Sequence, residues 1–294
     1  IPMEAIDEDD SDYGGLELKT ISECAINAAY RAGELIVEGI GSEVRKTKAS
    51  PRDLLTEVDG AAQSAIEETI KESFPDHAFL GEENVEPGAD AAAEALKSAT
   101  ANTTDWLWIV DPIDGTTNFA SGLPLSAVSI GVAYKGKLVI GVIYDPFRDE
   151  MFFASSGGGA WCNSQRIRSN PATDLVDAVV FAGSPPALNS MSPSLRGITA
   201  LMPHVRTVRM VGSAALMLAW VAAGRACAYF EPDLNAWDTA AGALLIQEAG
   251  GRVSDSLTNE PYELATRRIL ATNGPLHDKI HEILLDARAV ELDE

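Results

Sequence analysis

Two aspartates lie three residues apart where an apolar run ends, in the segment Trp108–Phe119 (WIVDPIDGTTNF). Gly115 allows the backbone to approach a ligand closely. The N–H groups from Gly115 onward would open a helix, and helix N-termini bind phosphate or sulfate. Carboxylates such as Asp111 and Asp114 are compatible with a neighbouring anion only when cations lie between them. Mg²⁺, a hard ion that prefers oxygen ligands, is the first candidate.

Two further acidic turns strengthen this interpretation. Glu82 and Glu83 follow a short predicted strand, Phe79–Gly81, and Asp238 lies at the start of a predicted helix. Taken singly, Asp114 and Asp238 are equally compatible with helix N-caps, and the two glutamates with solvated loop acids. Three acidic turns at strand–helix junctions are what a multi-metal phosphoryl-transfer site built from distant segments requires.

Four segments, in order along the chain, are similar to motifs of the inositol monophosphatase family. Trp108–Phe119 resembles its first signature and Trp237–Gly251 (WDTAAGALLIQEAGG) its second. Lys48–Asp59 (KASPRDLLTEVD) and Gly81–Glu83 resemble two further blocks, and the similarity extends over residues 16–285. The resemblance implies a layered αβαβα sandwich of the inositol monophosphatase and fructose-1,6-bisphosphatase type, usually a homodimer, with its site between two halves. It also implies Mg²⁺-dependent, Li⁺-sensitive hydrolysis of a phosphate monoester.

The resemblance also assigns metal ligands. Glu82, Asp111 and the carbonyl of Ile113 would hold a first Mg²⁺, and Asp111, Asp114 and Asp238 a second. Glu82 would help to hold a weaker third ion, with Asp59 in its outer shell.

The remaining assignments concern water, phosphate and alcohol. Thr116, hydrogen-bonded towards Asp59, would orient the attacking water, and the amides of Gly115 and Thr116 would bind the phosphate. The positions that would contact the substrate are Asp114, Gly212, Ser213, Ala214, Glu231 and Asp238.

The residues favour direct attack by a metal-activated water, because no Cys, His or suitably spaced Asp offers itself as a nucleophile. Glu231 lies seven residues before Asp238 at the end of a predicted strand, so both carboxylates can face one cleft. A carboxylate that accepts hydrogen bonds from hydroxyls suits a polyol, which favours inositol 1-phosphate. Histidinol phosphate is the alternative substrate, and a non-catalytic metal-dependent binding protein is the alternative class. The alternative interpretation is that Glu231 lies in solvent at the end of the strand.

Periodicity predicts the elements that position these residues, in a mixed α/β chain. Predicted helices cover residues 18–39, 61–74, 213–223, 237–249 and 275–286. Predicted strands cover residues 79–81, 106–110, 125–134, 137–144, 151–154, 159–167, 178–182, 206–210 and 226–230. The connection 84–105, longer than is usual in the family, holds at most one weak helix. We expect a first half at residues 16–150, a second at 151–288, and disorder in residues 1–15.

Composition excludes several classes of protein. With 44 Asp+Glu against 22 Lys+Arg, the net charge of −22 argues against nucleic acid as a partner. The longest apolar run, Met210–Ala223, is too short to cross a membrane. Three scattered cysteines suit a reducing compartment, so we expect a cytoplasmic protein or, after removal of a transit peptide, a plastid or mitochondrial one. The acidic segment Val290–Glu294 is expected in solvent.

Two patterns imitate phosphate-binding loops. Cys162 and Arg168 have the spacing of cysteine phosphatases, but the residues between them lack the glycines that such a loop needs. Gly131–Lys137 resembles a P-loop but is followed by Leu138, which has no hydroxyl for Mg²⁺. Both are interpreted as hairpin turns. Four histidines lie outside the acidic clusters and are expected at the surface or in packing: His77, His204, His277 and His281.

Overall fold

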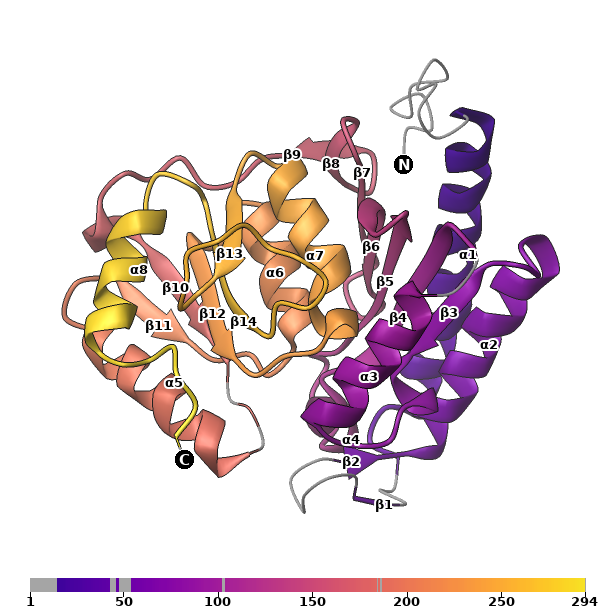
Figure 1. The fold of residues 1–294 in the computed structure, drawn as a ribbon, viewed down its shortest axis with the longest axis horizontal. Coiled ribbons are helices and arrows are strands. Elements are labelled where there is room, and N and C mark those ends of the chain that lie inside the picture. The colour runs from indigo at the N-terminus through magenta and orange to yellow at the C-terminus, as the bar shows by residue number, and fades with distance from the viewer. Residues whose placement is uncertain are drawn as a thin grey trace.

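The computed structural model describes residues 15–42, 46–47, 54–101, 104–183, 185 and 187–293. These residues form alternating layers of helices and sheets (Figure 1). One helix pair covers the outer face of a seven-stranded sheet, a second lies between the two sheets, and a third covers the outer face of a five-stranded sheet. In this order the helices are α1 (Gly15–Gly39), α2 (Glu57–Ser73), α6 (Ala214–Ala222), α7 (Ala236–Glu248), α5 (Leu188–Leu201) and α8 (His277–Asp286). The predicted αβαβα sandwich is confirmed.

The seven-stranded sheet has the strand order β3-β4-β5-β6-β7-β8-β9, in which β3 and β4 are parallel and the other neighbours antiparallel. Its strands are β3 (Ala78–Gly81), β4 (Trp106–Asp114), β5 (Ala127–Tyr134), β6 (Lys137–Asp145), β7 (Glu150–Ser155), β8 (Gly159–Cys162) and β9 (Gln165–Ile167). Strand pairing therefore crosses residue 150, where we expect the boundary between halves. By sheet membership the chain divides after Ile167, and the division into domains stays a prediction.

The five-stranded sheet has the order β11-β10-β12-β14-β13. Strand β10 is parallel to both of its neighbours, and β14 is antiparallel to both of its own. Its strands are β10 (Val179–Ala182), β11 (Thr207–Arg209), β12 (Ala228–Pro232), β13 (Arg252–Asp255) and β14 (Arg268–Thr272). Shorter elements complete the described chain: β1 (Lys46–Thr47), β2 (Leu54–Leu55), η2 (Glu82–Asn84), α3 (Ala89–Thr100), α4 (Thr116–Ala120) and η3 (Leu175–Asp177).

Helices α6 and α7 are apolar on nearly every side because both pack between two sheets. A helix in that position has no solvent face and needs no polar stripe. The contact with the first sheet is close: a Cβ on Gly141 of β6 would lie 2.6 Å from the carbonyl oxygen of Ala241 in α7. A glycine is required there, and the packing fixes the height of α7 above the sheet.

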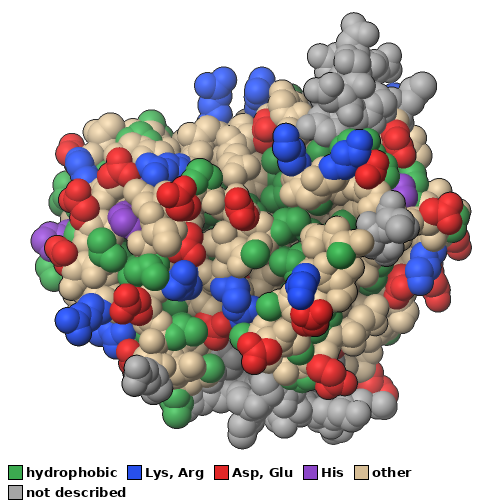
Figure 2. Space-filling view, in the orientation of Figure 1, with side chains coloured by type: hydrophobic (Ala, Val, Ile, Leu, Met, Phe, Trp, Pro, Cys, Tyr) green, Lys and Arg blue, Asp and Glu red, His purple; other side chains and the backbone are tan. Residues whose placement is uncertain are grey.

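Acidic side chains are spread over the face shown in Figure 2, with basic and apolar side chains among them. Within the described residues, no helix is both long and apolar enough to cross a membrane.

Several local expectations differ from the structure. Helix α2 begins at Glu57, not near residue 61, because Thr56 caps it. Helix α5 and strands β13 and β14 are absent from the prediction, and the single strand predicted at residues 159–167 is two strands, β8 and β9, separated by a turn at Asn163. The acidic C-terminal segment is not wholly in solvent: Val290 is buried, and Asp293 pairs with Arg196 at 2.9 Å. Gly15, the last residue of the segment expected to be disordered, is the first residue of α1. Residues 1–14, the rest of that segment, and residues 48–53, part of one family motif, lie outside the described residues.

Candidate active site

A β-bulge in β4 brings the two aspartates of the first motif to one side of the sheet. Asp111 pairs with Ser129 and Asp114 with Ala127, so β4 has one more residue than β5 between these pairs. In a regular strand, residues three apart point to opposite faces, and the bulge removes that difference. Ile113 packs in the core beneath α1 and α2, while the two carboxylates lie on the side of α6 and α7.

Asp238 reaches the same place from the first turn of α7. Its Oδ2 accepts the backbone N–H of Asn235, the residue before the helix, at 2.6 Å. The Ser129 hydroxyl donates to the carbonyl of Trp237 at 3.0 Å and holds this turn against β5. One carboxylate oxygen each from Asp111, Asp114 and Asp238 then lies within 4.8 Å of the others.

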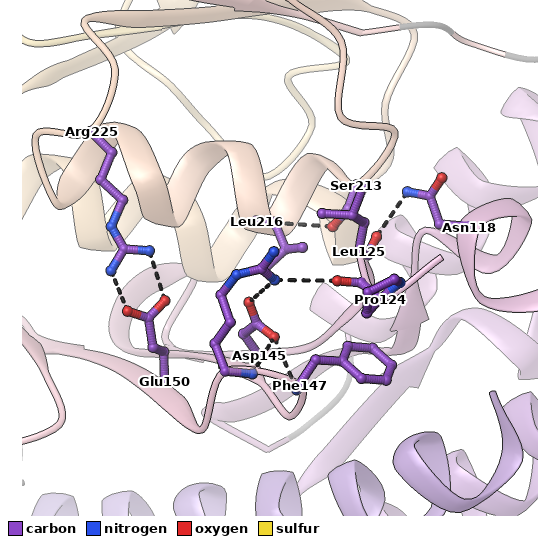
Figure 3. Close-up of polar contacts among 10 residues, drawn as sticks. Asn118, Pro124, Leu125, Asp145, Phe147, Glu150, Ser213, Leu216 and Arg225 are labelled. Carbon is purple, nitrogen blue, oxygen red and sulfur yellow. Dashed lines mark hydrogen bonds and ion pairs between the residues drawn. The ribbon is translucent and has the colours of Figure 1, made fainter. Parts of the chain in front are cut away.

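Asp114 is held by the beginning of α6. The Ser213 hydroxyl and the backbone N–H of Ala215, the latter at 2.8 Å, donate to its Oδ2, and the N–H of Ala214 donates to Oδ1 at 3.3 Å. Ser213 also caps α6 by accepting the N–H of Leu216 (Figure 3). The positive end of a helix therefore faces a buried carboxylate. The sequence points to Ser213 and Ala214 but misses Ala215.

Asp59 and Thr116 form the hydrogen bond that the sequence leads us to expect. The Thr116 hydroxyl lies 3.3 Å from Asp59 Oδ1 and 3.1 Å from the carbonyl oxygen of Ile113. Asp59 Oδ2 accepts both the backbone N–H and the hydroxyl of Thr56, at 2.8 Å and 2.6 Å. Asp59 is almost fully buried and fixed on both oxygens, so it holds the Thr116 hydroxyl in one direction.

Two members of the cluster, Asp114 and Asp238, are buried acids whose pKa values are raised. Burial, followed by the nearby Glu82, raises the pKa of Asp114 to about 6 despite its hydrogen bonds with Ser213 and the backbone. Burial and the charges of Asp114, Glu82 and Glu231 raise the pKa of Asp238 well above its ordinary value. Among the described residues neither Asp114 nor Asp238 forms an ion pair. A bound cation would supply the missing positive charge.

Glu231 is buried at the end of β12 and does not lie in solvent. Its Oε2 accepts the hydroxyl of Tyr229, and its side chain packs against the backbone of Gly183. Burial raises its pKa to about 8, with a further contribution from the charge of Asp114. Glu231 therefore belongs to the same acidic region as Asp114, as its sequence position suggests.

In the turn after the bulge, the backbone packs closely against neighbouring segments. Gly115 adopts φ +89° at the start of α4, and a Cβ there would meet the carbonyl of Leu125 at 2.9 Å. The Asn118 amide donates to the carbonyl of Leu125 at 2.8 Å (Figure 3). It also donates to the carbonyl of Val211 at 2.8 Å and so joins α4 to the segment before α6. The sequence gives no signal for Asn118, because its partners are fixed only by the tertiary fold.

The rejected patterns are not reactive sites. Asn163 adopts φ +53° in the turn between β8 and β9, where Cys162 ends a strand. Burial and nearby Glu150 raise the pKa of the Cys162 thiol, the opposite of an activated nucleophile. Glu150 is itself held by Arg225 (Figure 3). His277 is buried between the hydroxyls of Ser254 and Thr272.

Comparisons with known proteins agree with this geometry. Residues 17–289 match the Inositol monophosphatase family. Nus factor SuhB of Pasteurella multocida is 41% identical over 234 residues, which cover 79% of this chain and 83% of that protein. Inositol monophosphatase 2 of Solanum lycopersicum is 40% identical over 257 residues, which cover 86% of this chain and 94% of that protein.

Solved structures share the fold over nearly the whole chain. Extragenic suppressor protein suhB from Bartonella henselae has a TM-score of 0.81 and 34% identity, and the match covers 90% of this chain and 98% of that one. The staphylococcal enzyme SaIMPase-II with inositol monophosphate bound has a TM-score of 0.73 and 29% identity, and the match covers 91% of this chain and 94% of that one.

Proposed function

The chain belongs to the inositol monophosphatase family and is a phosphoric monoester hydrolase, and we propose that it hydrolyses inositol 1-phosphate to inositol and phosphate with Mg²⁺. The observation that carries the proposal is the cluster of Asp111, Asp114 and Asp238, whose carboxylate oxygens lie within 4.8 Å of one another. The Thr116 hydroxyl, which is hydrogen-bonded to Asp59, also contacts the carbonyl oxygen of Ile113. Ile113 lies in β4 between Asp111 and Asp114, the two members of the cluster from that strand.

The donors fit Mg²⁺, because they are carboxylate oxygens, and two of them, Asp114 and Asp238, form no ion pair with any residue that the structure describes. We assign Glu82, Asp111 and the Ile113 carbonyl to one ion, and Asp111, Asp114 and Asp238 to another. Glu82 contributes to a third, with Asp59 outside its first shell. When bound, such ions neutralise the phosphate and lower the pKa of a water molecule.

Thr116 and Asp59 orient the nucleophile in this proposal. The Thr116 hydroxyl has one proton and two acceptors within reach, Asp59 and the Ile113 carbonyl. The Ile113 carbonyl would be a metal ligand, which would leave Asp59 as the acceptor for the Thr116 proton and a Thr116 lone pair to accept a hydrogen bond from water. The water is thereby aligned for direct, in-line attack on phosphorus, and no covalent enzyme intermediate forms. The amides of Gly115 and Thr116 hold the phosphate oxygens.

Inositol 1-phosphate is the proposed substrate because a buried acid lies beside the site. Glu231 offers a carboxyl oxygen to neighbouring hydroxyls, and Gly212, Ser213 and Ala214 line the start of α6 next to Asp114. Inositol monophosphate bound to SaIMPase-II supports a substrate of this class. Histidinol phosphate remains the alternative, because an acid would also hold its amine. The family resemblance further leads us to propose Li⁺ sensitivity and a homodimer, which an inhibition curve and sedimentation measure.

Phosphate release tests the proposal. Purified protein with Mg²⁺ is assayed on inositol 1-phosphate, histidinol phosphate, fructose 1,6-bisphosphate and adenosine 3′,5′-bisphosphate, with EDTA as the control. Asp111→Asn keeps an acceptor for the Ile113 N–H but removes a ligand charge, so kcat should fall by about 10³ or more. Asp177→Asn, an exposed partner of Arg206, is the matched control and should keep kcat.

Three outcomes would contradict the proposed activity, the proposed substrate and the proposed role of Glu231. No turnover of any monoester at saturating Mg²⁺ favours a binding protein on this fold. Higher kcat/KM on histidinol phosphate than on inositol 1-phosphate overturns the substrate. Glu231→Gln should lower kcat/KM on inositol 1-phosphate while sparing a plain aryl phosphate, and equal losses on both would reject the role of Glu231.

A further inference from the structure

The turn that leads from β12 into α7 connects two acids of the proposed site. Glu231 lies in β12, Asp238 lies in the first turn of α7, and residues 233–235 join the two elements. Asp233 adopts φ +80°, a backbone conformation that is uncommon for residues other than glycine. A turn that contains such a residue keeps its shape because neighbouring groups hold it.

Arg267 contacts every residue of this turn. Its Nη2 donates to the Asp233 carboxylate, and its Nη1 donates to the side-chain oxygen of Asn235 at 2.5 Å. Its backbone carbonyl accepts the N–H of Leu234 at 2.7 Å. Arg267 immediately precedes β14, whose antiparallel pairing with β12 brings it opposite the turn. A single residue outside the acidic motifs therefore fixes three consecutive residues.

The hold on Asn235 extends to Asp238. The backbone N–H of Asn235 donates to Asp238 Oδ2 at 2.6 Å, so a displaced Asn235 would no longer fix this carboxylate. The same N–H lowers the pKa of Asp238, against the larger effects of burial and neighbouring acids, and so favours the charged form that binds a metal ion. Among the described residues, the ion-pair partner of Arg267 is Asp233. Arg267 thus acts on Asp238 through Asn235, and not as a direct counter-charge.

We propose that Arg267 is a positioning residue for Asp238, because it fixes the turn between β12 and α7 so that the Asp238 carboxylate is in place before a metal ion binds. The inference rests on the proposed role of Asp238 as a ligand of Mg²⁺. A ligand that is already held in place does not have to be ordered when the ion arrives, and binding is correspondingly tighter.

The neighbouring Arg268 provides a matched control. It pairs with Asp255 at 3.3 Å, and its side chain is 32% exposed, against 28% for Arg267. The two acids are also similar, with 15% exposure for Asp255 and 18% for Asp233. Asp255 otherwise accepts backbone N–H groups in the turn after β13. Both arginines therefore lose a part-buried ion pair when substituted, but only Arg267 is connected to Asp238.

Titration of the metal-free protein with Mg²⁺, followed by calorimetry, tests the proposal without substrate. Arg267→Gln should raise the Kd for Mg²⁺ by about tenfold or more, the usual effect of losing a residue that orients a metal ligand. Arg268→Gln should leave this Kd unchanged. The Tm of the metal-free protein should fall by similar amounts in both variants, because each loses one part-buried ion pair. With substrate, Arg267→Gln should need more Mg²⁺ for half-maximal rate, whereas kcat at saturating Mg²⁺ stays close to that of the parent.

A double-mutant cycle tests whether Arg267 acts through Asn235. Asn235→Ala removes the acceptor for Nη1 but keeps the backbone N–H that Asp238 accepts. Arg267→Gln should then weaken Mg²⁺ binding less in the Asn235→Ala background than in the parent. Arg267→Lys keeps the positive charge but lacks the planar fork that bonds two acceptors at once, so it should restore only part of the affinity.

Three results would overturn the proposal. They are equal Kd values of Arg267→Gln and Arg268→Gln for Mg²⁺, full additivity with Asn235→Ala, and full affinity of Arg267→Lys. Because Arg267→Lys keeps a cation beside Asp233, it decides the question even if Arg267→Gln does not fold. A parent protein that binds Mg²⁺ but releases phosphate from no monoester would reject the proposed activity alone. A parent protein that binds no Mg²⁺ would reject both proposals.

Discussion

Helices α2 and α7 begin in the same way but serve the site differently. In each, the third helical residue is an aspartate that accepts the backbone N–H of the residue before the helix: Asp59 from Thr56, and Asp238 from Asn235. Each aspartate uses Oδ2 for this bond. The capping box thus fixes the rotamer of a carboxylate and leaves its second oxygen for the site.

The two second oxygens meet different surroundings. Asp59 Oδ1 accepts the hydroxyl of Thr116 and is satisfied within the protein. Asp238 faces Asp114 and Glu82, and these charges together with burial raise its pKa. The same capping box therefore holds two different carboxylates: Asp59 at α2, which we propose positions Thr116, and Asp238 at α7, which we propose is a metal ligand. Substitution of Asp238 at α7 should therefore lower kcat without lowering Tm. At α2, where the carboxylate is satisfied within the protein, kcat and Tm should differ less in their response.

The largest expected effect is at α7. Asp238→Asn removes a ligand charge and should lower kcat by about 10³ or more. The Tm of the metal-free protein should stay the same or rise, because the substitution also removes repulsion with Asp114 and Glu82 while an amide oxygen can still accept the Asn235 N–H. Phosphate release and thermal unfolding in EDTA measure the two effects. Asp278→Asn, in the first turn of α8, is the control. A parallel loss of kcat and Tm would contradict the comparison.

The next test concerns the Thr116 hydroxyl, which Asp59 of α2 holds in place. Thr116→Val removes the donor to Asp59 and the group proposed to orient water, so kcat should fall by about 10², a usual contribution of proton-transfer geometry. KM and Tm should change little, because Asp59 keeps both bonds with Thr56. Steady-state kinetics and thermal unfolding give these values. An unchanged kcat would exclude Thr116 from the reaction, and a large loss of Tm would make it structural.

The sequence predicts which acids form the site but not how they meet. The types and order of Asp111, Asp114 and Asp238 indicate metal chemistry, and the three are found together. The bulge that brings Asp111 and Asp114 to one face has no signal in the sequence, because it depends on pairing with β5. The N–H of Ala215 that holds Asp114 lies 101 residues away in the chain, so only the tertiary fold reveals it.

Helix α5 shows the same limit in the fold. Its sequence, LNSMSPSLRGITAL, contains Pro193, which normally breaks a helix because the carbonyl four residues earlier loses its donor. That carbonyl, of Asn189, accepts the backbone N–H of Asp293 at 2.9 Å instead. A residue near the C-terminal end thus compensates for the proline. Elements whose pattern is local, such as β4 and α7, are predictable, whereas α5 depends on a distant partner.

A smaller effect tests whether the negative charge of Asp114, next to α7, is uncompensated. The folded-state pKa of Asp114 is about 6, above the ordinary 3.8, so the fold favours its protonated form. The unfolded chain takes up this proton only at lower pH, so acidification from pH 7 to pH 5 should stabilise the metal-free protein by roughly 1 kcal/mol through Asp114. This contribution is lost again as the pH rises through 6.

The difference between parent and Asp114→Asn measures that contribution together with the change in Asp238 and Glu231, whose pKa values the charge of Asp114 raises in the parent. Urea unfolding in EDTA at the two pH values measures it. With saturating Mg²⁺ the trend in the parent should reverse, because protons then compete with the ion for Asp114. Identical pH dependence of parent and variant in EDTA would show that Asp114 carries no uncompensated charge.

The smallest effect tests whether the α2 capping box is a support and not part of the chemistry. Thr56 is buried, accepts the Val58 N–H at 3.2 Å and donates to Asp59 at 2.6 Å. Thr56→Val removes this N-cap hydroxyl and should lower the free energy of unfolding by about 1 kcal/mol. Asp59 keeps the backbone N–H of residue 56 and the Thr116 hydroxyl, so kcat should change less than about threefold, within 0.7 kcal/mol. Thr199→Val in α5, whose exposed hydroxyl donates to the Leu195 carbonyl of its own helix, is the control for losing a local hydroxyl. If Thr56→Val lost as much kcat as Thr116→Val at unchanged stability, Thr56 would take part in the reaction. The capping box of α2 would then not be a structural support alone.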